Sequence, residues 1–101
     1  MKNKVIKFGA DWCGSCVRYK KEWTEATDKL STEYWDIVET EVGTENQDDL
    51  DLALTYGIKS LPTTVIVTDD NVKILHGYQT SFQLEYELGM HEQEVTVESV
   101  N

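Results

Sequence analysis

Two cysteines, Cys13 and Cys16, are the residues of this chain best suited to covalent chemistry. They lie two residues apart in the run Trp-Cys-Gly-Ser-Cys at 12–16 and are the only cysteines present. At this spacing two sulfurs can close a small disulfide with little movement of the backbone. An apolar strand pattern precedes the run and a helical pattern follows it, so both thiols are expected at the start of a helix. The pair can therefore make and break one disulfide.

The position of Cys13 favours its thiolate, the reactive form of a cysteine. Unpaired backbone N–H groups and the positive end of the helix dipole both stabilise an anion at a helix N-terminus. We expect Cys13 to attack a substrate disulfide and Cys16, deeper in the first turn, to resolve the mixed disulfide that results. Gly14 is expected to permit the tight turn at the helix start, and Ser15 to tune the pair.

Three other roles for the cysteine pair stay open on the residues alone. Two cysteines at this spacing can form half of a zinc site, but no second pair follows, and His76 and His91 lack zinc-finger spacing. The cysteines could instead be inert packing residues, which the neighbouring Trp12 and Gly14 disfavour. They could also survive in a domain that only binds a partner. The sequence implies no metal and no organic cofactor.

The composition is that of one small acidic domain. The 101 residues are 40% hydrophobic and carry a net charge of −10, from 19 acidic and 9 basic side chains. Nucleic acids and anionic membranes attract basic side chains, so this charge disfavours both as partners. Segment 1–8 lacks the apolar run of a secretory signal, which predicts a cytoplasmic protein. In a reducing cytosol, close cysteines serve redox chemistry more often than structure.

Hydrophobic periodicity and turn residues predict seven elements. Strands are expected at 5–8, 34–42, 63–68 and 72–77, and a helix from 13 to about 30. Two further helices are expected to begin at capping boxes, Thr44 with Gln47 and Thr80 with Gln83. The apolar residues of these helices are Val17, Trp23, Ala26 and Leu30 near helical spacing in the first, Leu50, Ala53 and Leu54 along one face of the second, and Phe82, Leu84, Tyr86 and Leu88 in the third.

This order, β-α-β-α-β-β-α, predicts an α/β fold with a four-stranded mixed sheet. The first two strands need a parallel, right-handed crossover, and the last two form an antiparallel hairpin. About three helices are expected to cover both faces of the sheet. Residues 1–90 would form the domain, and 91–101 an acidic tail that is partly disordered, because unanchored termini fray.

Three motifs in this order resemble the thioredoxin family over roughly residues 5–90. They are Trp-Cys-Gly-Ser-Cys at 12–16, Tyr-Gly-Ile-Lys-Ser-Leu-Pro-Thr at 56–63, and Gly77 followed by Gln83-Leu84. The resemblance implies a thioredoxin-like three-layer sandwich and a thiol–disulfide oxidoreductase that reduces protein disulfides. It also implies a cis peptide bond before Pro62. The residues implied to border the substrate groove are Trp12, Gly14, Ser15, Leu61, Pro62, His76, Gly77 and Tyr78.

The same resemblance implies partners for the chain. Disulfide-containing proteins would be its substrates, with an extended segment pairing with the Leu61 backbone as a strand joins a sheet edge. A thioredoxin reductase, or glutathione, would donate electrons, and the chain would be a monomer.

Three features depart from the family pattern. The chain begins at the family's second strand, which gives it a shorter, glutaredoxin-like outline. Ser15 replaces the usual proline, which should weaken the chain as a reductant. Lys7 replaces a buried aspartate that is thought to take the proton from the second cysteine. The Lys7 ammonium could extend to water with no role, or lie under the disulfide and tune the thiol pKa of Cys16.

Two alternative functions follow from these departures. One is a glutaredoxin-like, glutathione-dependent reductase, which the short, glutaredoxin-like topology favours. In such an enzyme the basic residues Arg18, Lys20 and Lys21 could hold glutathione carboxylates. The same residues could instead pair with nearby acidic side chains. The other is a thioredoxin-fold binding module, which the retention of both cysteines disfavours.

Overall fold

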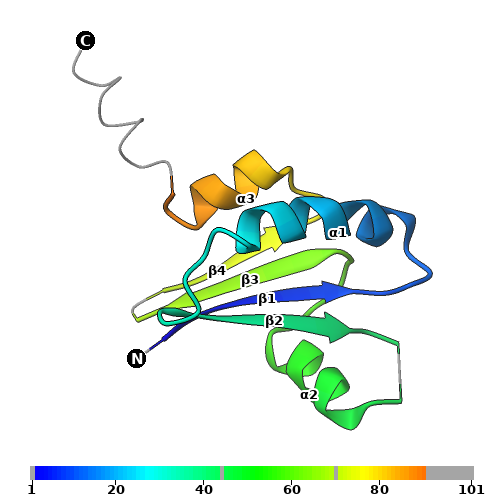
Figure 1. Cartoon of the computed structure of the whole chain (residues 1–101). Helices are drawn as coiled ribbons and strands as arrows, with labels where there is room; N and C mark the ends of the chain where they lie inside the picture. The colour runs from blue at the N-terminus through cyan, green and yellow to red at the C-terminus, as the bar shows by residue number, and fades with distance from the viewer. Residues whose placement is uncertain (1, 44, 70, 91–101) are drawn as a thin grey trace.

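A four-stranded mixed sheet between two helical layers organises the chain (Figure 1). The structure, a computed structural model, describes residues 2–43, 45–69 and 71–90. The elements, in chain order, are β1 (Asn3–Gly9), α1 (Gly14–Thr27), β2 (Trp35–Glu41), α2 (Gln47–Thr55), β3 (Thr63–Thr68), β4 (Asn71–His76) and α3 (Ser81–Glu87). The predicted element order and fold class are confirmed.

The sheet has the strand order β2-β1-β3-β4. β1 is parallel to β2, with Lys7 opposite Glu39 and Gly9 opposite Glu41. β1 is antiparallel to β3, and β3 is antiparallel to β4. Because side chains alternate between the two faces of a strand, Lys7, Gly9, Glu39 and Glu41 all belong to the same face of the sheet.

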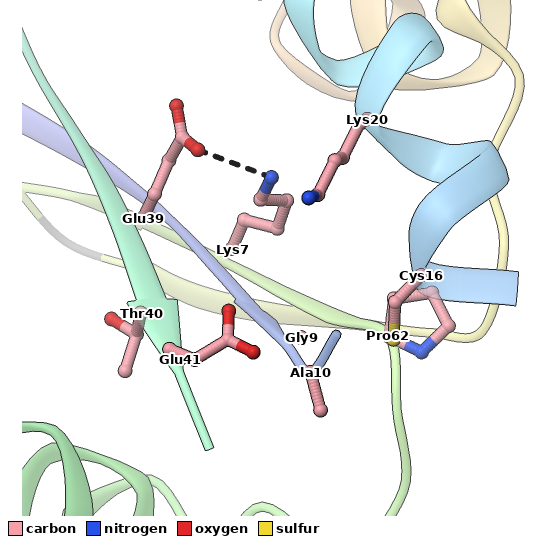
Figure 2. A pocket seen from close by; sticks show the side chains of 9 residues that line it. All are labelled: Lys7, Gly9, Ala10, Cys16, Lys20, Glu39, Thr40, Glu41 and Pro62. Carbon is pink, nitrogen blue, oxygen red and sulfur yellow. Dashed lines mark ion pairs between the residues drawn. The ribbon is translucent and has the colours of Figure 1, made fainter. Parts of the chain in front are cut away.

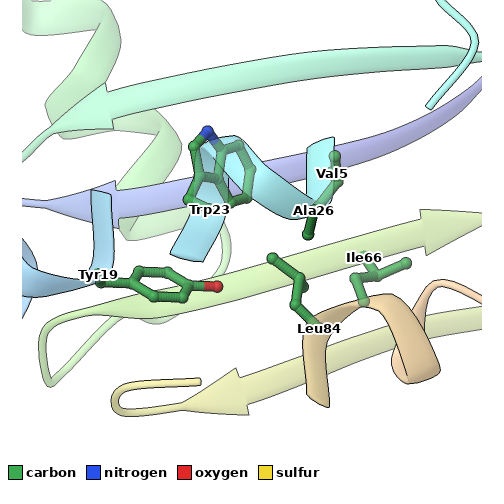
Figure 3. Close-up of a cluster of buried hydrophobic side chains, with 6 residues drawn as sticks. All are labelled: Val5, Tyr19, Trp23, Ala26, Ile66 and Leu84. Carbon is green, nitrogen blue, oxygen red and sulfur yellow. The ribbon is translucent and has the colours of Figure 1, made fainter. Parts of the chain in front are cut away.

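That face is covered by α1 and α3. Val5 and Ile66 of the sheet pack there against Tyr19, Trp23 and Ala26 of α1 and Leu84 of α3 (Figure 3). Ile6, Phe8 and Val65 point to the other face and pack against Ala53 of α2. The core is thus two apolar layers, one on each side of a central pair of strands, β1 and β3.

Local signals predicted some helix boundaries and not others. The capping box at Thr80 is confirmed, since its side chain accepts the Gln83 N–H and the Gln83 side chain accepts the Thr80 N–H. The box predicted at Thr44 is wrong, because Asn46 caps α2 by accepting the Asp49 N–H. Thr44 itself lies outside the described residues, as does the tail predicted at 91–101.

Several apolar residues of the predicted helices lie on the surface. Val17 and Leu54 are exposed, Leu54 by 78%, and so are Phe82 and Tyr86. α1 also ends at Thr27, earlier than predicted, and two turns carry the chain past Leu30. Each helix rests on the sheet through a narrower apolar stripe than its composition suggests. No helix in the three described stretches has the length and apolar character needed to cross a bilayer.

Candidate active site

Cys13 is the N-cap of α1, at the end of the loop that follows β1. Its N–H donates to the Ala10 carbonyl at 3.1 Å, and its own carbonyl accepts the Val17 N–H at 3.1 Å. The Cys13 Sγ accepts the N–H of Cys16 at 3.3 Å. The sulfur therefore occupies the position that a serine or aspartate oxygen takes at other helix starts.

Cys16 lies one turn inside α1 and is almost inaccessible, with 4% of its surface exposed. Both cysteines are free thiols in this structure. Burial raises the pKa of the Cys16 thiol from 9.0 to about 11, with smaller contributions from the Cys13 sulfur and the Glu41 carboxylate. The two cysteines thus have different environments: Cys13 is partly exposed, and Cys16 is buried.

A cavity of about 140 Å³ lies beneath Cys16 (Figure 2). Gly9 forms part of its wall, where a Cβ atom would come within 3.6 Å of the Cys16 sulfur. The charged side chains that line the cavity come from three elements: Lys7 from β1, Glu39 and Glu41 from β2, and Lys20 from α1. Ala10, Thr40 and Pro62 complete its lining.

Lys7 does not extend to water, so the first of its two predicted placements is wrong. Its side chain is buried, 9% exposed, and its Nζ lies 3.2 Å from Oε1 of Glu39. The same Nζ lies 5.6 Å from the centre of the Trp23 ring. A buried ammonium needs such partners. Lys7 therefore places a paired cation in the cavity that Cys16 also lines.

The 61–62 segment lies beside the cysteines, as the resemblance implied. The Leu61–Pro62 peptide bond is cis. The Cys13 thiol donates to the Leu61 carbonyl at 3.9 Å, and Pro62 lines the cavity with Cys16. The Gly77 N–H in turn donates to the Pro62 carbonyl at 2.8 Å, which ties the end of β4 to this segment. Three distant parts of the chain thereby meet at one end of the sheet.

The other residues predicted to border the substrate groove differ in their exposure and in their contacts. Trp12 is 75% exposed, and Tyr78 is partly exposed with its ring 6.1 Å from the Tyr19 ring. Ser15 accepts a hydrogen bond from Arg18 at 3.3 Å. His76 is exposed at the end of β4, opposite Thr63, and no contact joins it to either sulfur within the described residues.

Gly14 is not required by the turn, contrary to expectation. It belongs to α1, and a Cβ atom added there would meet only the Arg18 guanidinium, at 3.8 Å.

Lys20 is one of the three basic residues that follow the cysteines. Its Nζ lies 3.7 Å from Oδ1 of Asp11, which favours pairing of these basic residues with acidic neighbours over binding of glutathione carboxylates.

Sequence reasoning missed three residues of the site. Glu39 and Glu41 lie under the cysteines because β2 pairs with β1 in the register given above, and Gly43 lies against the Trp12 indole. The alternation of charged residues along β2 was a signal for a polar face, but only the pairing with β1 brings that face to Cys16. Among the residues at 2–43, 45–69 and 71–90, no cluster of three or more His, Cys, Asp or Glu side chains is arranged to hold a metal.

The family model and the sequence relatives that match this chain agree with one another. Residues 1–88 match the family model described as Thioredoxin. The thioredoxin of Mycoplasma genitalium is 35% identical over 65 residues, covering 64% of this chain and 58% of that protein. A protein disulfide-isomerase of Ricinus communis is 30% identical over 70 residues, covering 69% of this chain and 14% of that protein. The chain thus spans only part of the length of these relatives.

Solved structures agree on the fold. Chloroplastic thioredoxin z superposes with a TM-score of 0.70 at 23% identity, covering 91% of this chain and 80% of that chain. Thioredoxin-2, a component of the malaria parasite protein secretion machinery, gives a TM-score of 0.74 at 19% identity, covering 89% and 84%. With the match of the family model to residues 1–88, these findings show that the chain belongs to the thioredoxin family.

Proposed function

We propose that this chain reduces disulfides in protein substrates through a reversible dithiol–disulfide exchange at Cys13 and Cys16. The observation that carries the proposal is the asymmetry of the two thiols. Cys13 caps α1 and is partly exposed, whereas Cys16 is buried one helical turn further on. The Cys13 sulfur can then attack a disulfide in a large partner, and the Cys16 sulfur can react afterwards, within the chain, with the mixed disulfide on Cys13.

The proposed cycle has two displacements that balance in atoms and electrons. The Cys13 thiolate attacks one sulfur of the substrate disulfide, and the other substrate sulfur leaves as a thiolate. Cys16 then loses its proton and attacks the Cys13 sulfur of the mixed disulfide, which releases the second substrate thiolate. The substrate gains two electrons and two protons, and the chain is left with a Cys13–Cys16 disulfide.

The surface around Cys13 supports an extended protein segment as the substrate. Trp12 and Tyr78 offer exposed apolar area, and the Leu61 carbonyl lies 3.9 Å from the Cys13 Sγ. Backbone pairing with Leu61 would hold the segment in register, and the groove would also include Gly14, Ser15, Pro62, His76 and Gly77. Lys7 would tune the thiols from below.

An electron donor must regenerate the dithiol after each cycle. We assign this role to a thioredoxin reductase and place the cycle in the cytoplasm, where such a reductant keeps thiols reduced. A monomeric chain suffices, because every group of the proposed cycle comes from one copy.

Trapping with a Cys16→Ser variant tests the proposed function. Without a resolving thiol, the variant should hold substrates as mixed disulfides on Cys13 that dithiothreitol releases, and a Cys13→Ser variant should trap none. Partners that remain bound in reductant would indicate a binding module instead. Activity supported by glutathione, with none supported by a thioredoxin reductase, would indicate the glutaredoxin-like alternative.

A further inference from the structure

Resolution of the mixed disulfide requires Cys16 to lose a proton in a buried place. In the free dithiol, burial and the neighbouring Cys13 sulfur raise the pKa of the Cys16 thiol to about 11, so this thiol is protonated at pH 7. Cys16 is 4% exposed and, with Pro62, lines the cavity beneath it. The groups that line this cavity are therefore the candidate proton acceptors.

Four charged side chains line the cavity, and two of them, Glu39 and Glu41, are carboxylates. Glu39 lies 3.2 Å from the Lys7 ammonium, and 62% of its side chain is exposed to solvent. Glu41 is opposite Gly9 in the pairing of β2 with β1, and Gly9 is the residue directly under Cys16. The charge of Glu41 also acts on the Cys16 thiol. Strand register therefore makes Glu41 the carboxylate best placed to serve Cys16.

Glu41 is also held in place. Its Oε2 accepts the backbone N–H of Asp11 at 2.6 Å, in the loop that leads from β1 to Cys13. This contact fixes one carboxylate oxygen to the loop that carries the active cysteines. The cavity, about 140 Å³, is large enough for water molecules to connect Glu41 with the Cys16 sulfur.

We propose that Glu41 accepts the proton of Cys16, through water in the cavity, when Cys16 resolves the mixed disulfide. The inference rests on the proposed function, because it concerns the second displacement of that cycle. The proton passes from the Cys16 sulfur to the Glu41 carboxylate. The thiolate attacks the Cys13 sulfur, the bond from Cys13 to the substrate breaks, and the departing substrate thiolate takes up a proton from Glu41 or solvent.

A purely electrostatic role for Glu41 predicts the opposite effect of its removal. The negative charge of Glu41 helps to raise the pKa of the Cys16 thiol. Removing that charge without removing a proton acceptor would make Cys16 easier to ionise, and resolution would be faster. Loss of a proton acceptor makes resolution slower. The sign of the change therefore separates the two roles.

Stopped-flow reaction with dithiobis(nitrobenzoate), an aromatic disulfide that releases a coloured thiolate, follows both steps. The first thiolate released reports attack by Cys13, and the second reports resolution by Cys16. The variant is Glu41→Gln, whose amide oxygen can still accept the Asp11 N–H. The control is Asp36→Asn, which removes the same charge from β2 but on the opposite face of the sheet. Glu41→Asp keeps a carboxylate and should recover much of the rate.

We expect Glu41→Gln to slow the second release by at least about tenfold at pH 7, with the first release changed less than about twofold. Between pH 6 and 9 its second rate should rise in proportion to hydroxide, because only solvent then ionises Cys16. An unchanged or faster second release in Glu41→Gln, or an equal slowing in Asp36→Asn, would overturn the inference. A native chain that releases no second thiolate would instead refute the proposed exchange cycle.

Discussion

The buried thiol of Cys16 should make the reduced protein less stable in alkali by an amount that the structure predicts. Its pKa is 9.0 in the unfolded chain and about 11 in the folded protein. The unfolded state therefore loses this proton first as the pH rises. The stabilisation is fully present below about pH 9 and is lost as the pH rises through about 11.

The size of the effect follows from the two pKa values. At pH 10 the loss is about 1.4 kcal/mol, and it approaches about 2.7 kcal/mol above pH 11, since each unit of pKa difference corresponds to about 1.36 kcal/mol. Because Cys16 is 4% exposed, solvent screening reduces this figure little. A free energy of this size is a large part of the stability of a small domain.

Urea denaturation of the native chain and a Cys16→Ala variant, both in a reducing agent, measures the effect. The variant loses the thiol and also some packing, but the packing term does not depend on pH. The difference between the two free energies of unfolding should therefore shrink by about 1.4 kcal/mol between pH 8 and pH 10. A difference that is constant over this range would refute the assignment of Cys16 as a buried, neutral thiol.

Three further substitutions test other parts of the structure. Tyr19→Phe removes the 2.7 Å hydrogen bond to the Thr64 hydroxyl, which is buried, so urea denaturation should show a loss of about 1–2 kcal/mol. Thr80→Ala removes the N-cap of α3 and should cost about 1 kcal/mol by the same measurement, with full retention of stability contradicting the cap. Lys7→Met should change the free energy of unfolding by less than about 1 kcal/mol, because the exposed Glu39 stays hydrated. The same variant should raise the pH at which Cys16 is alkylated, and an unchanged thiol titration would rule out an electrostatic role for Lys7.

Features that depend only on residues close together in the sequence could be predicted from it. The Thr80 capping box and the 63–68 strand are local, and both are confirmed. The failure at Thr44 is also local. Asn46 is an equally good N-cap and lies closer to the apolar residues of α2, so two candidate caps competed within three positions.

The chemistry beneath Cys16 could not be predicted in the same way. Alternation along β1 and β2 tells which residues share a face of each strand, but not which residues lie opposite one another. The parallel pairing of Lys7 with Glu39 and of Gly9 with Glu41 joins strands that are separated in the chain by α1. Whether Lys7 reaches water depends on this pairing and on Trp23 of α1, which covers it. Predicting that burial requires the tertiary structure.

The different exposure of the two sulfurs also bears on damage by peroxide. Oxidation begins at accessible thiolates, so the partly exposed Cys13 would form a sulfenic acid before the buried Cys16. A sulfenic acid condenses with a nearby thiol to give a disulfide and water, and Cys16 lies within one helical turn. The chain thereby carries its own protection against irreversible sulfinic and sulfonic acids, because the first oxidised form of Cys13 is converted into the disulfide that an electron donor can reduce.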